Sequence, residues 1–192
     1  MPAPAVPNAP RTVFTVGHSN RSWEEFVKLV TSHGIAAIAD VRRFPGSRRL
    51  PQFNDVNLAK SLPPAGIRYL PFPPLGGRRK PNPDSVNTGW RNDSFRAYAD
   101  YMQTDEFAAA LEELLGAASN QATAIMCAEA VPWRCHRSLI ADALLVRGWQ
   151  VLDVMSPTSV KPHKLTPFAR VDGTRITYPP EQEALPFPTR PA

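Results

Sequence analysis

The stretch Ala122–Gly148, ATAIMCAEAVPWRCHRSLIADALLVRG, decides how the rest of the chain is interpreted. It opens with a short apolar run, 122–127, that predicts a buried strand, and it closes with 134–147, whose apolar spacing predicts a helix. The polar loop between them holds both cysteines of the chain, Cys127 and Cys135. In α/β proteins, a strand that feeds a helix through a polar loop is a common place to bind a ligand.

Length and composition are those of one globular domain. The chain has 192 residues, of which 43% are hydrophobic. No apolar run approaches the roughly 20 residues of a membrane-spanning helix, and the opening residues MPAPAVPNAPR lack the regions of a signal peptide. We therefore expect a cytoplasmic location and no membrane partner. Two cysteines in a chain of this length also fit a reducing compartment.

The chain is basic, with a formal net charge of +5 and a pI of about 9.6. Its arginines cluster in two short loops, 42–49 and 78–80. Such clusters are consistent with solvated loops, and equally with a surface that binds an anionic small molecule or nucleic acid.

Strand-like and helix-like segments alternate along the chain. Apolar runs predict strands at 12–16, 35–41, 67–72, 122–127 and 149–154, and Asp172–Gly173 marks a hairpin turn. Helices are expected at 23–33, 54–62, 94–102, 105–118 and 134–147, and 156–166 is expected to be a polar connection. This pattern predicts an α/β fold: a single three-layer domain with a mainly parallel sheet flanked by helices, plus a C-terminal β-hairpin.

We expect this domain to span residues 11–178. A disordered Pro/Ala-rich tail is predicted at 1–10 and a second Pro-rich tail at 179–192. The sequence identifies no cofactor and no oligomeric state.

Polar residues follow three of the predicted strands. They are His18, Ser19 and Asn20 after the first strand, Asp40, Arg42 and Arg43 at the second, and Cys127 and Glu129 at the fourth. Because parallel strands present their carboxyl ends at one edge of a sheet, we expect these residues to converge. The loop 76–80, which includes Arg78, follows the third strand and is expected to cover them.

Each of these residues also has a purely structural interpretation. Cys127 and Cys135 fit the core equally well, since free cysteines are among the most buried residues. His18 could bond loop backbone, and Asp40 could pair with a nearby arginine. If Cys135 lies exposed in a first helical turn, its thiol is expected to be more acidic than that of Cys127.

Several motifs together resemble the bacterial family catalogued as domain of unknown function 488. They are TVGHSNRS at 15–22, ADVRRFPGSRR at 39–49, PLGGRRKP at 74–81, MCAEAVPWRCHRSLIADAL at 126–144 and PHKLTPFA at 162–169. The resemblance runs from about residue 13 to 178. It implies an α/β fold and no particular reaction, and it marks as its signature His18, Asp40, Arg42, Cys127, Glu129, Cys135, His136 and Arg137.

The first of four hypotheses is an enzyme that acts on an anionic substrate such as a nucleotide. The candidate catalytic residues are Cys127, Glu129, His18 and Asp40. The candidate anion-binding residues are Ser19, Asn20, Arg42, Arg43, Arg78, Arg134, Cys135, His136 and Arg137. A phosphatase-like or rhodanese-like cradle is not claimed, because Trp133 occupies the position after Cys-x5 where that cradle needs an arginine.

Three other hypotheses remain open. A nucleic-acid-binding protein is favoured by the basic loops and by Phe44, Phe53 and Trp90 among them, although Trp90 and Trp133 are interpreted mainly as packing residues. A metal site of cysteines and histidines lacks a standard zinc spacing, and adjacent Cys135 and His136 would diverge on a helix, so no metal is predicted. The two cysteines could also form a redox pair.

Overall fold

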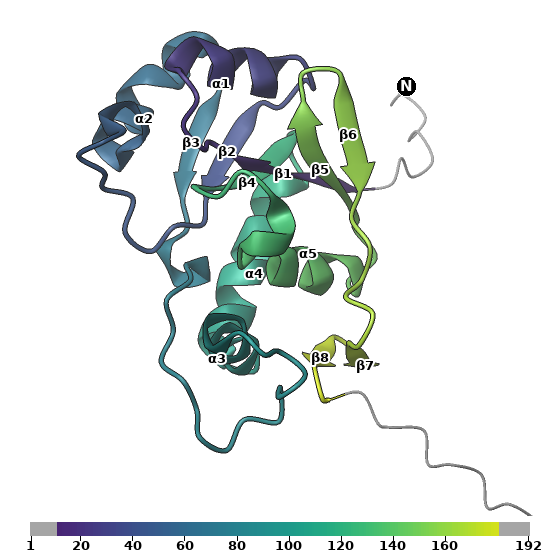
Figure 1. Cartoon of the computed structure of the whole chain (residues 1–192). Coiled ribbons are helices and arrows are strands. Elements are labelled where there is room, and N and C mark those ends of the chain that lie inside the picture. The colour runs from purple at the N-terminus through teal and green to yellow at the C-terminus, as the bar shows by residue number, and fades with distance from the viewer. Residues whose placement is uncertain (1–10, 181–192) are drawn as a thin grey trace, which may run out of the picture.

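A six-stranded sheet forms the centre of the molecule (Figure 1). The computed structural model describes residues 11–180, so the tail predicted at 1–10 and all but two residues of the tail at 179–192 lie outside the described residues. The strand order is β3-β2-β4-β1-β5-β6. The strands are β1 (Thr12–Gly17), β2 (Ala37–Asp40), β3 (Arg68–Pro71), β4 (Thr123–Cys127), β5 (Gln150–Ser156) and β6 (Ser159–Pro162).

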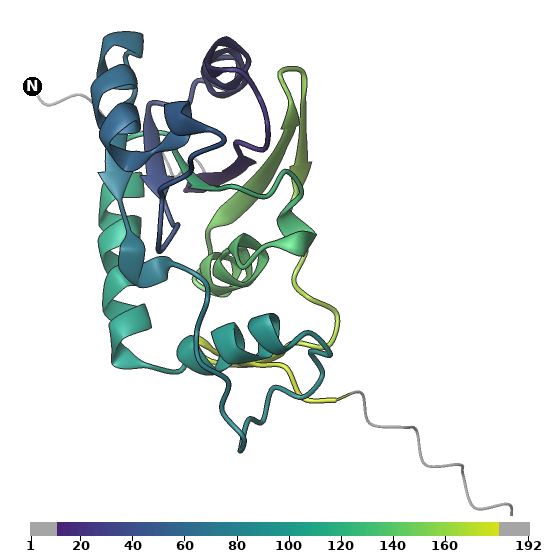
Figure 2. The same cartoon turned by 60° about the vertical axis from the view of Figure 1, so that its left-hand side comes forward.

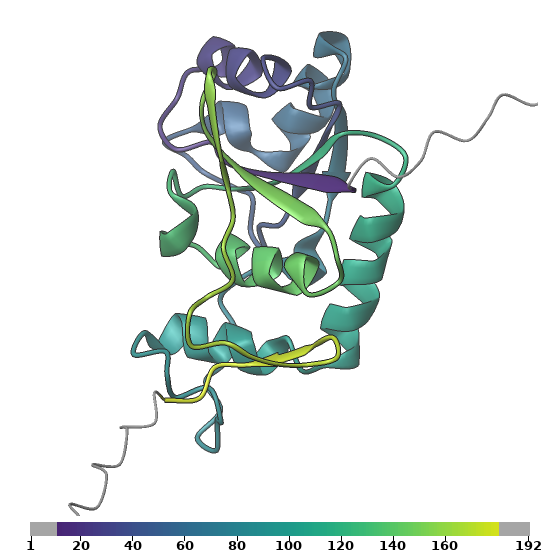
Figure 3. The same ribbon diagram turned by 90° about the vertical axis from the view of Figure 1, so that its right-hand side faces the viewer.

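Strands β1 to β5 are parallel to one another, and only β6 runs antiparallel to its neighbour β5. Helices cover both faces (Figure 2), which confirms the predicted α/β fold with three layers. On one face lie α1 (Trp23–Thr31) and α2 (Asp55–Ser61). On the other lie α4 (Asp105–Ala118) and α5 (Arg137–Leu145), with α3 (Asp93–Tyr101) beyond α5 (Figure 3). None of the helices in the described part of the chain is long and apolar enough to cross a membrane.

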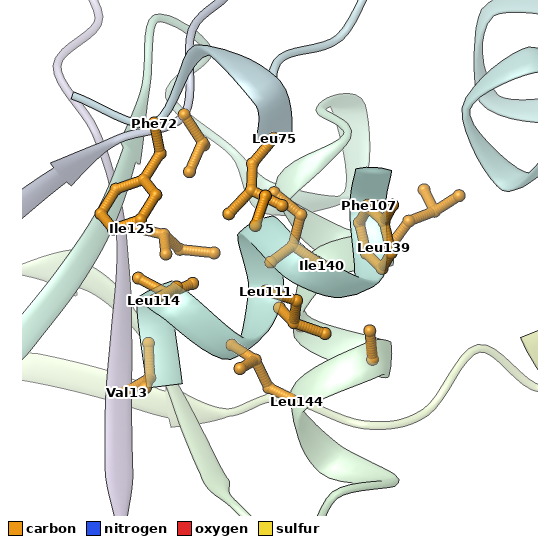
Figure 4. Packing of buried hydrophobic residues seen from close by; sticks show 14 of the residues in the cluster. Val13, Phe72, Leu75, Phe107, Leu111, Leu114, Ile125, Leu139, Ile140 and Leu144 are labelled. Carbon is orange, nitrogen blue, oxygen red and sulfur yellow. The ribbon is translucent and has the colours of Figure 1, made fainter. Parts of the chain in front are cut away.

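The sheet separates two hydrophobic cores, and the central strand β4 contributes to both. Alternate side chains of a strand point to opposite faces. Ile125 (Figure 4) and Cys127 therefore pack with α4 and α5, whereas Ala124 and Met126 pack with α1 and α2. All five residues of β4 are buried, which is why its sequence is an unbroken apolar run with no alternation of polar residues.

Two local predictions were wrong. The segment 156–166 is not only a connection, because β6 forms there as a short edge strand with a bulge in its pairing to β5. Its sequence, SVKP, has too little apolar character to reveal a strand. The predicted helix 134–147 begins three residues later, at Arg137, after a separate 3₁₀ turn at Pro132–Arg134. The predicted C-terminal hairpin is present as β7 (Arg170–Asp172) and β8 (Arg175–Thr177).

A buried carboxylate on α5 holds the C-terminal segment against the sheet. Asp142 is fully buried and accepts hydrogen bonds from His163 Nε2 at 3.0 Å, from the backbone N–H of Thr166 at 3.1 Å and from the hydroxyl of Tyr178 at 2.9 Å. The other ring nitrogen of His163 faces Asp153 of β5 at 3.4 Å. Burial alone would lower the pKa of His163, but the hydrogen bonds to Asp142 and then Asp153 raise it to about 9.

The protonated imidazole of His163 should therefore stabilise the fold. A raised pKa contributes stability that is fully present below the unfolded value of about 6.5 and is lost as the pH rises through 9. We expect wild-type protein to exceed His163→Gln in free energy of unfolding, by an amount that shrinks between pH 6.5 and 9. Urea unfolding of both proteins across this range measures the difference, and a constant difference would contradict the bridging role.

The backbone approaches so closely at the end of β1 that only glycine fits. A Cβ on Gly17 would lie 1.8 Å from the carbonyl oxygen of Glu129, whereas a Cβ on Gly116 in α4 would meet nothing within 4 Å. We expect Gly17→Ala to lower the free energy of unfolding by at least about 1–3 kcal/mol. As the matched control, Gly116→Ala should raise it by about 0.5–1 kcal/mol. Urea denaturation measures both, and equal effects would show that the close approach at Gly17 relaxes freely.

Candidate functional site

The parallel register brings the three predicted polar clusters to one edge of the sheet. Gly17 at the end of β1 pairs with Cys127 at the end of β4, and Asp40 at the end of β2 pairs with Met126. The ladder continues past the strands, because the N–H of His18 donates to the carbonyl of Cys127 at 3.0 Å. The segments that follow β1, β2 and β4 therefore lie side by side at the carboxyl edge.

A pocket of about 230 Å³ opens at this edge. It is lined by the loop after β2, the loop after β3, the end of β4 with the residues that follow it, and the residue before α5. The lining residues are Arg42, Arg43, Phe44, Gly77, Arg78, Cys127, Ala128, Glu129 and His136. Six of the predicted site residues thus share one cavity: Arg42, Arg43, Arg78, Cys127, Glu129 and His136.

Asp40 holds Arg42 in a fixed position at the wall of the pocket. Both side chains are buried, and Nε and Nη2 of Arg42 donate to the two carboxylate oxygens of Asp40 at 2.7 and 2.6 Å. Nη2 also donates to the carbonyl of Phe53, and the Tyr69 hydroxyl donates to Asp40 at 2.9 Å. Burial disfavours the guanidinium, but the hydrogen bonds to Asp40 more than offset it and raise the pKa of Arg42. Asp40 therefore positions the arginine and does not itself reach the pocket.

His18 lies behind Arg42 and is not among the residues that line the pocket. Its ring stacks on Phe53 with centroids 4.2 Å apart, Nδ1 lies 2.8 Å from the carbonyl of Ser19, and Nε2 lies 3.2 Å from Nη1 of Arg42. Since the carbonyl can only accept, Nδ1 carries the proton and Nε2 accepts from the guanidinium. Burial lowers the pKa of His18 to about 4, so the ring is neutral at pH 7 and helps to orient Arg42.

The two thiols and His136 form a compact cluster. Cys127, Cys135 and His136 each place a potential ligand atom within 4.8 Å of the other two. The hydrogen bond between the thiols, together with burial, raises the pKa of Cys127 to about 12. The same hydrogen bond, together with the charge and N–H groups of Arg137, lowers the pKa of Cys135 to about 6 despite burial. Cys135 is thus the more acidic thiol, but not for the expected reason, because it is buried and precedes α5 and does not lie exposed in the first helical turn.

Five predicted anion-binding residues lie outside the pocket lining: Ser19, Asn20, Arg134, Cys135 and Arg137. Arg137 is 1% exposed, and its guanidinium donates to the Thr15 hydroxyl at 3.1 Å and to the carbonyl of Glu129 at 2.5 Å, so it fixes the loop after β4. The hydroxyl of Ser19 is turned to Asn20, and Arg134 is exposed on the 3₁₀ turn. Ser19, Asn20 and Arg134 therefore do not line the pocket.

Three pocket residues, Phe44, Gly77 and Ala128, are not among the predicted site residues, although Phe44 was considered for nucleic-acid binding and Gly77 lies in the loop expected to cover the site. The double glycine in the loop after β3 was a usable signal for Gly77, because a close approach of backbone to a site requires glycine. Arg79 does not line the pocket. Its Cζ lies 3.4 Å from the centroid of the Tyr101 ring, and its guanidinium donates to the carbonyls of Gly76 and Pro74.

Comparison with known proteins gives one match. The family model described as "Domain of unknown function DUF488" matches residues 22–144, which include every residue that lines the pocket and all of α5 except its last residue. No curated protein and no solved structure matches the chain.

The buried pair of Asp40 and Arg42 should be far more important for stability than an exposed one. Asp40→Asn leaves the guanidinium of Arg42 without its counter-charge, and breaking a buried pair costs about 3–5 kcal/mol. Asp93→Asn is the matched control, because Asp93 pairs with Arg96 at the surface of α3 and such pairs contribute about 1 kcal/mol or less. Urea unfolding at pH 7 compares the two variants. Similar losses would show that Asp40 is no more than an ordinary surface partner.

Proposed function

The chain belongs to the family described as domain of unknown function DUF488, and from the pocket at its sheet edge we propose that it is an enzyme acting on an anionic, phosphate-bearing substrate such as a nucleotide. The observation that carries this proposal is the lining of that pocket. Three arginines, Arg42, Arg43 and Arg78, line it together with Cys127, Glu129 and His136. Cationic anchors thus adjoin groups capable of nucleophilic or acid–base chemistry.

The arginines differ in how firmly they are held. Arg42 is fixed by Asp40, whereas Arg43 and Arg78 are exposed and linked only by a hydrogen bond from Nη1 of Arg43 to the carbonyl of Arg78 at 3.1 Å. In our proposal, Arg42 sets the position of the anion, and Arg43 and Arg78 close on it. Planar guanidinium groups suit this task because they bind phosphate oxygens in a bidentate way.

The size of the pocket bears on which part of a substrate enters it. Its volume of about 230 Å³ is below the roughly 300–1,000 Å³ of pockets that enclose a drug-sized ligand. We therefore propose that the charged end of the substrate enters, and that the remainder extends toward Phe44, whose side chain is 64% exposed at the rim.

Binding of inorganic phosphate and of adenosine monophosphate, measured by calorimetry, tests the anion site. A charge-assisted hydrogen bond contributes about 1.5–3 kcal/mol, so Arg43→Ala and Arg78→Ala should each weaken binding about tenfold or more. Arg170→Ala on β7 removes the same charge from an exposed position outside the pocket and should leave the affinity unchanged. Equal affinities in all four proteins would overturn the proposal.

Turnover is tested on a panel of phosphate esters followed by chromatography. Cys127→Ser and His136→Ala should abolish product formation, and in metal-free protein they should change phosphate affinity little, because both residues line the pocket without carrying its positive charge. Loss of phosphate binding in both variants would instead mean that they shape the pocket and do no chemistry.

A second candidate, nucleic-acid binding without catalysis, is favoured by two exposed aromatic side chains. Phe44 is 64% exposed and lies 5.6 Å from the guanidinium of Arg43, and Trp133 is 62% exposed, contrary to its predicted packing role. Phe53 is fully buried and Trp90 packs against Phe95, so neither is available for stacking. Under this alternative, a single-stranded oligonucleotide binds tightly, Phe44→Ala weakens it, and no phosphate ester is turned over.

A further inference from the structure

The Cys127, Cys135 and His136 cluster has the geometry of a metal site with three protein ligands. Zinc binds thiolate sulfur at about 2.3 Å and imidazole nitrogen at about 2.0–2.1 Å in tetrahedral arrangement. Those bond lengths place neighbouring sulfur and nitrogen ligands roughly 3.6 Å apart and two sulfurs roughly 3.8 Å apart. Sγ of Cys135 lies 3.6 Å from Nδ1 of His136, and all three ligand atoms lie within 4.8 Å of one another.

The imidazole of His136 is held in the tautomer that a metal requires. Nε2 lies 2.9 Å from the carbonyl oxygen of Val41, and because that oxygen can only accept, Nε2 carries the proton. The lone pair of Nδ1 therefore faces the thiols. A hydrogen bond from the second ring nitrogen to a backbone carbonyl is the usual support for a histidine that ligates a metal.

The loop after β3 leaves room at this nitrogen. A Cβ on Gly77 would lie 3.0 Å from Nδ1 of His136 and 3.3 Å from Cγ. Glycine at this position keeps the space beside Nδ1 free on the side of the pocket. The residue thus affects access to the ligand atom without being a ligand.

Adjacent residues converge here because the helix has not yet begun. Cys135 and His136 were expected to diverge because both were placed on one helix, but α5 begins at Arg137. Cys135 is extended, with φ −136° and ψ 147°, and His136 then turns into the helix with φ −55° and ψ −14°. This change of conformation directs both side chains toward Cys127.

We propose that Cys127, Cys135 and His136 bind one zinc ion or a similar transition-metal ion, with a fourth coordination position open to the arginine-lined pocket. Two thiolates and one imidazole are ligands that zinc prefers. Both thiol protons are displaced when the metal binds, so the site presents two negative charges to a divalent cation. Cys127 and His136 line the pocket, which directs the open position toward it.

The open position determines what the pocket binds. Three protein ligands and one exchangeable position are typical of catalytic zinc, whereas four protein ligands are typical of structural zinc. An oxygen of the anionic substrate, or a water, would occupy the fourth position while the arginines bind the remaining charge. The binding of substrate at the fourth position rests on the proposed function, because it requires that the pocket bind an anionic substrate.

Metal content and spectroscopy test the site on the full chain. Purified protein, stripped of metal under reducing conditions, is titrated with Co²⁺ and with Zn²⁺ in competition with a chromophoric chelator. We expect one ion per chain and, with Co²⁺, the intense absorption of tetrahedral thiolate coordination. Cys135→Ser and His136→Ala should lose the ion, and Gly77→Ala, which removes no ligand, should weaken it. His33→Gln is the control, because the His33 ring bonds the carbonyl of Ser156 and is not part of the cluster.

The outcomes separate this inference from the proposed function. Wild-type protein that binds neither ion, or that retains binding in His136→Ala, overturns the metal site, and so does a disulfide between Cys127 and Cys135 that persists in its place. Phosphate binding that depends on Arg78 would still support the enzyme proposal in that case. Conversely, stoichiometric metal with phosphate binding insensitive to Arg43→Ala and Arg78→Ala supports the metal site and overturns the anion pocket. Circular dichroism of Cys135→Ser and His136→Ala establishes that loss of metal is not loss of fold.

Discussion

The buried guanidinium of Arg137 connects the start of α5 to strand β1 and to the loop after β4. It lies in the first turn of α5, 1% exposed, and donates to the Thr15 hydroxyl in β1 and to the carbonyl of Glu129 after β4. Thr15 in turn donates to Asp153 of β5 at 2.7 Å. Hydrogen bonds and a counter-charge offset the cost of burying a cation; here Asp153 supplies the charge through Thr15, while Nε of Arg137 has no hydrogen-bond partner in the described part of the chain. The start of α5, two strands and the loop at the pocket are therefore fixed together, and with them Cys135.

The same polar chain continues to the C-terminus. From Asp153 it passes through His163 to Asp142, which also binds the hydroxyl of Tyr178. With Arg137 and a protonated His163, the buried charges alternate in sign along the chain, which limits the cost of burying them. Because Asp142 lies on α5, this network holds the second turn of the helix that Arg137 holds at its start. The position of the thiol cluster thus depends on residues far from it in sequence, and the C-terminal hairpin contributes to the site without touching it.

The parallel strands could be predicted from the sequence because each is marked by its own local run of apolar residues. The apolar runs at β1, β2 and β4 end in polar residues, and parallel pairing alone then brings Asp40 near Cys127. The features of the site that could not be predicted from the sequence depend on contacts between segments that are distant along the chain. No spacing rule distinguishes Arg137, buried against Thr15, from Arg43, which faces the pocket. The convergence of the two cysteines depends on one extended residue before α5, and helical periodicity carries no information about that residue.

Backbone strain is concentrated where the pocket is. In the described part of the chain, the non-glycine residues with positive φ are Ser19 at 52° and Arg78 at 58°. Such a conformation costs about 1–2 kcal/mol per residue, and neither residue is buried in a core that would gain from it. Ser19 follows β1 at the carboxyl edge, where its N–H binds the carbonyl of Ala128, and Arg78 lines the pocket itself. Since glycine would relieve the strain at Arg78, the side chain at that position favours a role in binding over a role in folding, whereas the strain at Ser19 accompanies the bond of its N–H to the loop after β4.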